Sequence, residues 1–201
     1  SLAADLQRYG IRTVYVYATY MRAGSTFGAT YAYAPFFVSH LKEAYPEVIV
    51  QAWMGLPLKF PIPALWPGTV DLADRRTRAQ IVDLAAWMVE EAGFDGVHLD
   101  PEPVASGDRY LLRLLEELRA RLPTGAILSI SGRHIAPFTG WIGESLVAPW
   151  AWSPGYYRQV ASHVDEIGVM VYDSSMPWAW AYRAWTCVQT MRVSGALAGT
   201  G

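Results

Sequence analysis

One short stretch of the chain places three ionisable side chains at alternate positions. His98, Asp100 and Glu102 stand two residues apart in a run that starts at Gly96 and is otherwise apolar. Because successive side chains of a strand point to opposite faces, these three would share one face. Strands of a parallel sheet are usually apolar on both faces, so three ionisable groups in a row are costly unless they are paired or used.

The end of this stretch indicates where its chemistry would take place. Pro101 has no N–H to give to a neighbouring strand, so it suits the point at which the chain leaves the sheet. Glu102 then lies at the carboxyl end of the strand, the edge that carries the active sites of parallel α/β proteins. Like-charge repulsion from Asp100 is expected to raise the pKa of one of the two carboxyls.

Three kinds of site fit these residues. A structural hydrogen-bond network would use His98 and Asp100 and leave Glu102 in solvent. A metal site on all three, joined by His134, is chemically possible, although one strand that presents three ligands is cramped. Acid catalysis on a sugar needs a protonated carboxylic acid at the leaving oxygen. Two carboxyls on one strand lie on the same side of a substrate, which favours attack by the substrate's own 2-acetamido group, oriented by Asp100.

Alternating strand and helix patterns supply the frame for this stretch. Strands are predicted from runs rich in β-branched and aromatic residues, and helices from apolar residues three or four positions apart. Five strands are expected, at residues 13–18, 48–53, 96–102, 127–132 and 166–173. Six helices are expected, at residues 2–9, 35–45, 78–92, 108–122, 156–164 and 178–193. The basic run RRTR at residues 75–78 is expected to be a solvated face.

Strands joined by helix-length connections predict a parallel sheet of right-handed β–α–β units. Two architectures remain open: an open doubly wound sheet, or a (β/α)8 barrel with one strand missing at the front and two at the back. The glycine fingerprints of nucleotide-binding open sheets are absent from the sequence. We therefore expect one partial (β/α)8-type domain over residues 1–201. A start at Ser1 rather than Met indicates processing or a piece of a longer protein.

Composition and charge exclude several classes of partner. The 201 residues are 52% hydrophobic and 17% charged, which excludes a disordered chain. A net charge of −2 offers no basic field for a phosphate backbone, so nucleic acid is not expected. The single cysteine, Cys187, excludes an internal disulfide and is expected to be buried in its apolar helix. No uncharged apolar run reaches the roughly 18 residues that a membrane span needs.

Two motifs resemble those of a known enzyme family. The run DGVHLDPE at residues 95–102 resembles the Asp-Gly-x-Asp-x-Asp-x-Glu signature of glycoside hydrolase family 18, the chitinases and endo-N-acetylglucosaminidases. The run MVYD at residues 170–173 is similar to the family's Met-x-Tyr-Asp motif. In that family the two motifs lie on the fourth and sixth strands of a (β/α)8 barrel. If one strand preceded Ser1, the expected strands at residues 96–102 and 166–173 would also be the fourth and the sixth.

The resemblance implies retaining, substrate-assisted hydrolysis of a β-linked N-acetylhexosamine glycan without a cofactor. Glu102 would be the general acid/base, Asp100 would position the acetamido group, and Tyr172 would hydrogen-bond that group. His98 occupies the position of an aspartate in the family signature. In the family, that aspartate shares a proton with the next aspartate of the signature, which corresponds to Asp100. The expected substrate contacts within the two motifs are Asp95, His98 and Asp173.

Tryptophans at the ends of strands and in the long loops are candidate platforms for sugar rings, because flat aromatic faces stack on sugars. The expected platform residues are Trp53, Trp150, Trp152 and Trp178.

Two other functions remain open. A non-catalytic barrel would bind an oligo- or polysaccharide without turnover. A metal-dependent hydrolase or isomerase would use His98, Asp100 and Glu102 and would lose its activity on chelation. Many members of the family act outside the cell, so the resemblance implies an extracellular or cell-surface location.

Overall fold

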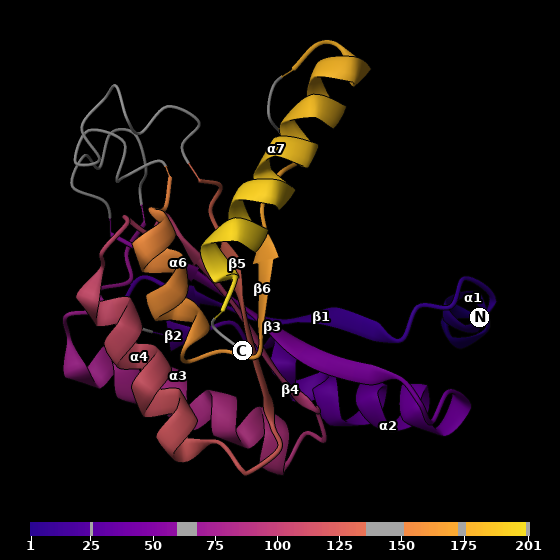
Figure 1. Ribbon diagram of the computed structural model, residues 1–201. Helices are drawn as coiled ribbons and strands as arrows, with labels where there is room; N and C mark the ends of the chain where they lie inside the picture. Colours follow the sequence, from indigo (N-terminus) through magenta and orange to yellow (C-terminus); the bar gives the residue numbers. More distant parts are fainter. Residues whose placement is uncertain (25, 60–67, 136–150, 173–175, 200–201) are drawn as a thin grey trace.

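The computed structural model describes residues 1–24, 26–59, 68–135, 151–172 and 176–199. The strands are β1 (Thr13–Arg22), β2 (Thr26–Phe27), β3 (Ile49–Pro57), β4 (Gly96–Glu102), β5 (Ile127–Gly132) and β6 (Glu166–Val169). The helices are α1 (Leu2–Arg8), the 3-10 helix η1 (Ala29–Tyr33), α2 (Ala34–Ala44), α3 (Arg75–Glu90), α4 (Arg109–Arg121), α6 (Pro154–Ala161) and α7 (Ala179–Leu197) (Figure 1).

The strands form one sheet in the order β2-β1-β3-β4-β5-β6. β1, β3, β4, β5 and β6 run parallel, which confirms the five expected strands, and the two-residue β2 adds an antiparallel pair at the end of β1. The sheet is strongly curled, because Tyr15 Oη on β1 lies 3.2 Å from Glu166 Oε2 on β6 although three strands separate them. A curled parallel sheet is of the (β/α)8 type, and within the described residues the barrel is not closed.

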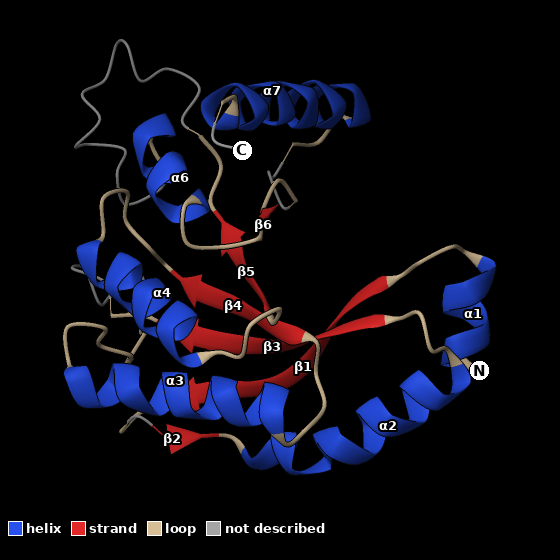
Figure 2. Cartoon of the chain, turned by 60° about the horizontal axis from the view of Figure 1, so that its bottom comes forward, coloured by secondary structure: helices blue, strands red, loops and turns tan. Residues whose placement is uncertain are grey.

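The hydrophobic core lies between the outer face of the sheet and the helices. Val97 and Leu99 of β4 are fully buried in it, as are Leu111, Leu115 and Leu118 of α4. Figure 2 shows α2, α3 and α4 packed along one side of the strands. Since apolar residues occupy the outer face, the alternate polar residues of each strand point to the concave inner face.

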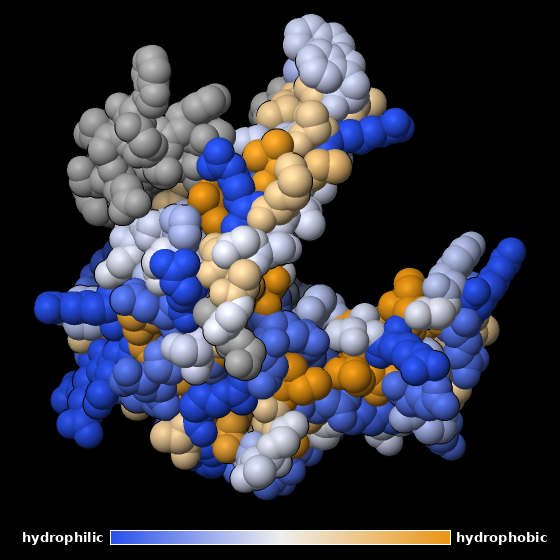
Figure 3. Space-filling view, viewed as in Figure 1, coloured by the Kyte–Doolittle hydropathy of each residue, from blue (hydrophilic) through white to orange (hydrophobic). Residues whose placement is uncertain are grey.

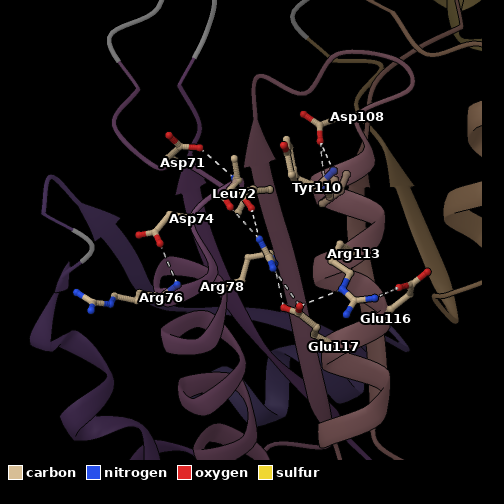
Figure 4. Close-up of polar contacts among 12 residues, drawn as sticks. Asp71, Leu72, Asp74, Arg76, Arg78, Asp108, Tyr110, Arg113, Glu116 and Glu117 are labelled. Carbon is tan, nitrogen blue, oxygen red and sulfur yellow. Dashed lines mark hydrogen bonds and ion pairs between the residues drawn. The ribbon is translucent and has the colours of Figure 1, made fainter.

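The start of α3 corrects one expectation. The Asp74 carboxylate caps this helix by accepting from Arg76 N at 3.0 Å, so the basic run forms its first turn. Arg78 is buried, with 7% of its surface exposed, and is not part of a solvated face. Its guanidinium donates to Leu72 O at 2.7 Å and to both carboxylate oxygens of Glu117 on α4, at 3.0 and 3.2 Å (Figure 4). The expectation of a solvated run was wrong at this residue because α3 packs against α4.

We expect Arg78→Met to lower the free energy of unfolding by about 2 kcal/mol, because it leaves the buried Leu72 carbonyl without its donor and removes two hydrogen bonds from the half-buried Glu117, which keeps the one from Arg113. Urea unfolding of the two proteins measures the loss. Arg76→Met is the matched control, since that side chain is exposed and should change stability by less than about 0.5 kcal/mol. Equal losses in the two variants would contradict a structural role for the Arg78 ion pair.

The last strand is shorter than expected, since β6 ends at Val169 and not at residue 173. Its hydrogen-bonded neighbour β5 ends at Gly132, which pairs with Val169. Met170 N still donates to Gly132 O at 2.9 Å, and then Val171 N turns back to Val169 O at 2.9 Å. The described part of the MVYD motif therefore follows the strand and does not lie within it.

Helix α7 projects from the body of the molecule, with pale and orange residues along it in the space-filling view (Figure 3). Gln189 is buried and ties the helix down, since it donates to Ile135 O and accepts from Ile135 N, both at 2.9 Å. Cys187 is exposed, so the expectation that it is buried was wrong. In the described part of the chain no helix is both long and apolar enough to cross a membrane.

Candidate active site

Strand β4 brings the three ionisable residues to the inner face of the curled sheet. It lies between β3 and β5, with His98 opposite Trp53, Asp100 opposite Gly55, and Glu102 opposite Pro57. The alternate residues Val97 and Leu99 are fully buried on the other face, against the helices, and Pro101 is buried as well. This confirms the shared face and places Glu102 at the carboxyl edge of the sheet.

His98 is enclosed by hydroxyl groups and an aromatic ring. Its Nδ1 lies 2.7 Å from Ser129 Oγ and its Nε2 lies 3.0 Å from Ser131 Oγ. The Tyr15 ring centroid is 4.3 Å from that of His98. Burial lowers the pKa of His98 to about 4, and the charge of Glu166 opposes this shift. His98 is therefore neutral at neutral pH.

A chain of hydrogen bonds continues from His98 across the inner face. Ser129 Oγ donates to Gln51 Oε1 at 2.6 Å, and Gln51 Nε2 donates to Glu166 Oε2 at 3.0 Å. Tyr15 Oη donates to the same carboxylate oxygen at 3.2 Å. These contacts join β1, β3, β4, β5 and β6 inside the curl, so they fix the inner face that carries the two carboxyls.

The two carboxyls at the end of β4 are both half-buried. Burial raises the pKa of Asp100, whose Oδ1 is buried and accepts no hydrogen bond within the described part of the chain. Burial and the charge of Asp100 raise the pKa of Glu102, while the charge of Arg133 lowers it. A carboxylic acid that keeps its proton above the usual range is the group that general acid catalysis requires.

Two residues that the sequence did not indicate also face these carboxyls. Tyr20 lies near the end of β1, and burial together with the charges of Asp100 and Glu102 raises the pKa of its phenol. Arg133 directly follows β5. Both lie at the carboxyl edge of the sheet. The position of Arg133 directly after a predicted strand could have indicated this from the sequence. Tyr20 was missed because the first strand was expected to end at residue 18.

Gly55 leaves room for the aromatic rings beside Asp100. A Cβ at this position would lie 2.4 Å from Tyr20 Cδ2 and 2.9 Å from Trp53 Cη2. We expect Gly55→Ala to lower the free energy of unfolding by about 1–2 kcal/mol, because both rings must move. Thermal unfolding measures this change. Gly195→Ala is the control, because no atom lies within 4 Å of its added Cβ and helix α7 favours Ala; a loss as large in the control would contradict the steric argument.

Part of the MVYD motif can be located. Tyr172 lies just beyond β6 and is 66% exposed. Asp173 and Trp150 lie outside the described residues. The roles expected for these three residues stay predictions.

Asp95 lies at the amino end of β4, opposite the edge that carries Glu102. Its Oδ1 accepts from Lys42 Nζ at 2.7 Å and its Oδ2 accepts from Val50 N at 2.8 Å. Asp95 therefore has a structural position, in which it joins β4 to β3 and α2. The motif led us to expect it near Asp100 and Glu102, and the structure does not place it there.

The tryptophans differ in what they offer to a sugar. Trp53 is half-buried on the inner face, with its ring centroid 5.3 Å from that of Tyr17. Trp178 is 60% exposed and nearly parallel to Trp180, at 16° and 6.2 Å. Trp152 is 1% exposed, so its faces are covered by the core and are not available for the expected stacking. The position of a tryptophan in a long loop does not indicate whether its ring is buried in the core or exposed.

The metal alternative has no support from the donor groups. Among the described residues, no three His, Cys, Asp or Glu side chains are grouped so that they could hold a metal ion. Both ring nitrogens of His98 are within hydrogen-bond distance of serine hydroxyls. His134 contacts the edge of Trp185, at 5.3 Å between ring centroids.

Comparison with known proteins identifies the fold. No family model and no curated protein matches the chain. The Bacillus cereus spore cortex-lytic enzyme SleL matches with a TM-score of 0.67 and 15% identity, over 96% of this chain and 43% of that one. The chitinase from Chromobacterium violaceum matches with a TM-score of 0.66 and 16% identity, over 96% and 60%. The Group IV chitinase of Ostrinia furnacalis matches with a TM-score of 0.58 and 20% identity, over 85% and 46%.

A family GH18 chitinase from Cycas revoluta also matches, with a TM-score of 0.59 and 17% identity over 81% of this chain and 48% of that one. Together these similarities confirm a fold of the family 18 chitinase type. The chain spans about half the length of most of these structures. At these identities the comparison establishes the fold alone.

Proposed function

We propose that the protein is a glycoside hydrolase that cleaves a β-linked N-acetylhexosamine glycan with retention, by substrate-assisted acid/base catalysis. The observation that carries the proposal is the pairing of Asp100 and Glu102 on the inner face of a family 18-like sheet, at its carboxyl edge. Both carboxyls have a raised pKa, and Asp100 Oδ1 is a buried acceptor to which no group among the described residues donates.

In this mechanism Glu102 gives its proton to the glycosidic oxygen as the bond to the anomeric carbon breaks. The oxygen of the substrate's acetamido group forms the new bond to that carbon, which yields an oxazolinium ion and the shortened glycan. Asp100 Oδ1 accepts the acetamido N–H and so aims the attacking oxygen. Water then attacks the anomeric carbon, the bond between that carbon and the acetamido oxygen breaks, and the proton that the water loses returns to Glu102, which restores the acid and the acetamido group.

The solved neighbours support a first choice of ligand. The Ostrinia furnacalis chitinase was solved with allosamidin, and the Cycas revoluta chitinase with allosamidin and, as variants, with (GlcNAc)3 and (GlcNAc)4. Oligomers of N-acetylglucosamine are therefore the first substrates that we would test. The extracellular or cell-surface location implied by the resemblance is part of this proposal.

The test uses two matched chromogenic substrates, one made of N-acetylglucosamine and one of glucose, with the same linkage and length. We expect turnover of the first, inhibition by allosamidin, and indifference to a chelator. The glucose oligomer should not react, because it has no acetamido group to attack the anomeric carbon. Equal turnover of both substrates would contradict substrate assistance. Turnover that stops on chelation would favour the metal alternative.

A glycan-binding role without turnover is the second candidate. It is favoured by His98, which occupies the place of a proton-sharing aspartate in the family signature and is held neutral. Binding of allosamidin without hydrolysis of any N-acetylglucosamine oligomer would support this alternative.

A further inference from the structure

A β-bulge near the end of β1 changes which side chains reach the inner face. Tyr17 pairs with Trp53 of β3, but the next pair joins Thr19 to the following residue of β3, so the register shifts by one residue. Unbroken alternation from Tyr17 would put residue 19 on the inner face and residue 20 in the core. Instead Thr19 and Met21 are fully buried, and Tyr20 between them is 41% exposed. The bulge therefore turns Tyr20 to the inner face, at the carboxyl edge of the sheet.

The bulged end of β1 is held by Gly28, which directly follows β2. Thr19 Oγ1 donates to Gly28 O at 2.9 Å, and Gly28 N donates to Tyr20 O at 3.1 Å. β2 pairs with β1 immediately after Tyr20, since Met21 lies opposite Phe27. These contacts fix the backbone of Tyr20 and, with it, the direction in which the side chain leaves the strand.

Gly55 lets the ring of Tyr20 extend across β3. Tyr20 pairs with Gly55, and Gly55 pairs with Asp100 of β4, so the three positions form one row across the sheet. A Cβ at Gly55 would lie 2.4 Å from Cδ2 and 3.0 Å from Cε2 of Tyr20. One edge of the ring therefore passes over the middle position of the row, where a larger residue would block it.

The hydroxyl group of Tyr20 lies close enough to both carboxyls to interact with their charges. Burial raises the pKa of this phenol above its usual value of 10, and the charges of Asp100 and Glu102 raise it further. The phenol therefore keeps its proton at neutral pH and can donate a hydrogen bond.

We propose that Tyr20 is a substrate-binding residue, whose hydroxyl donates a hydrogen bond to an oxygen of the sugar bound beside Asp100 and Glu102. The hydroxyl groups of a sugar accept hydrogen bonds around the edge of its ring, and the partly exposed Tyr20 is open to a ligand on the inner face. The identity of the ligand rests on the proposed function. The position of Tyr20 does not rest on it, since it follows from the bulge and from Gly55.

Tyr20→Phe tests the contact, because it removes the hydroxyl and keeps the ring over Gly55. We expect this variant to bind an N-acetylglucosamine tetramer about 3–10-fold more weakly in calorimetry, which is the loss of one hydrogen bond. KM for a chromogenic oligomer should rise by the same factor with kcat nearly unchanged, because a contact made equally to substrate and transition state contributes to binding alone. Tyr9→Phe is the matched control. Tyr9 is 69% exposed and precedes β1 at the opposite edge of the sheet, so its variant should bind like the wild type.

A second measurement tests the position of the hydroxyl without a ligand. The 13C NMR signal of Tyr20 Cζ, assigned by its loss in Tyr20→Phe, should shift as the pH is raised from 4 to 8 and the two carboxyls ionise. Charges in a half-buried site are screened less than charges in water, so their ionisation reaches the phenol. Glu102→Gln removes one of the two charges and should reduce this shift.

Equal affinity for the tetramer in the wild type and Tyr20→Phe, or a Cζ signal that does not move with pH, would overturn the proposal even if the wild type hydrolyses the oligomer. Weaker binding by Tyr20→Phe in a protein without turnover would overturn the proposed hydrolysis and support Tyr20 as a sugar-binding residue. A wild-type protein that binds no N-acetylglucosamine oligomer would overturn both.

Discussion

Glu102→Gln is expected to lower kcat on an N-acetylglucosamine oligosaccharide by roughly 10²–10⁴-fold, the usual contribution of a general acid. The amide keeps the size of the side chain and its place at the end of β4 but has no acidic proton to give to the leaving oxygen. Burial and the charge of Asp100 raise the pKa of Glu102, so the wild-type enzyme should stay active to a higher pH than an ordinary carboxylic acid allows. A pH profile of kcat for the wild type measures the pH at which activity falls as Glu102 loses its proton.

Binding separates this role from a structural one. Glu102→Gln should bind the oligosaccharide about as tightly as the wild type, as measured by calorimetry, because the amide retains most polar contacts. Glu116→Gln, on the exposed side of α4, is the matched control and should keep full turnover. Undiminished turnover in Glu102→Gln would exclude Glu102 as the acid. Loss of both binding and turnover would indicate that the carboxyl shapes the site and would leave its proton transfer unsupported.

The local features of the site could be predicted from the sequence, because strand alternation depends on neighbouring residues alone. The inner face of His98, Asp100 and Glu102 and the bounds of β4 and β5 agree with the expectation. The length of β6 could not be predicted, since a strand ends where its partner ends, and Gly132 of β5 is far away in the sequence.

Packing explains the remaining differences. Arg78 looks like part of a basic surface until α4 brings Glu117 to it. Trp152 has the sequence context of a loop residue, yet the core encloses it and Val104 O accepts its indole N–H at 3.2 Å. The chain from Glu166 to His98 joins residues up to 115 positions apart, so no pattern along the sequence could show it.

His98 is expected to make stability depend on pH between about 7 and 4. Its pKa falls from 6.5 to about 4 in the folded protein, so in this range the unfolded chain binds more protons than the native one. Stability is therefore highest above pH 6.5 and is lost as the pH falls towards 4, by up to about 3 kcal/mol from this residue. Asp100 and Glu102, whose pKa values are raised, act in the opposite sense, because the native state binds their protons more tightly.

Comparison with His98→Gln isolates the histidine from these carboxyls. Glutamine can give one hydrogen bond and accept another, as His98 does with the two serines, but it does not titrate. Urea unfolding at intervals from pH 7 to pH 4.5 should show a smaller loss of stability in the variant than in the wild type. His40→Gln, an exposed histidine on α2, is the control and should follow the wild type. If His98→Gln also followed the wild type, the pKa of His98 would be the same in the native and unfolded states, and the lowered pKa would be wrong.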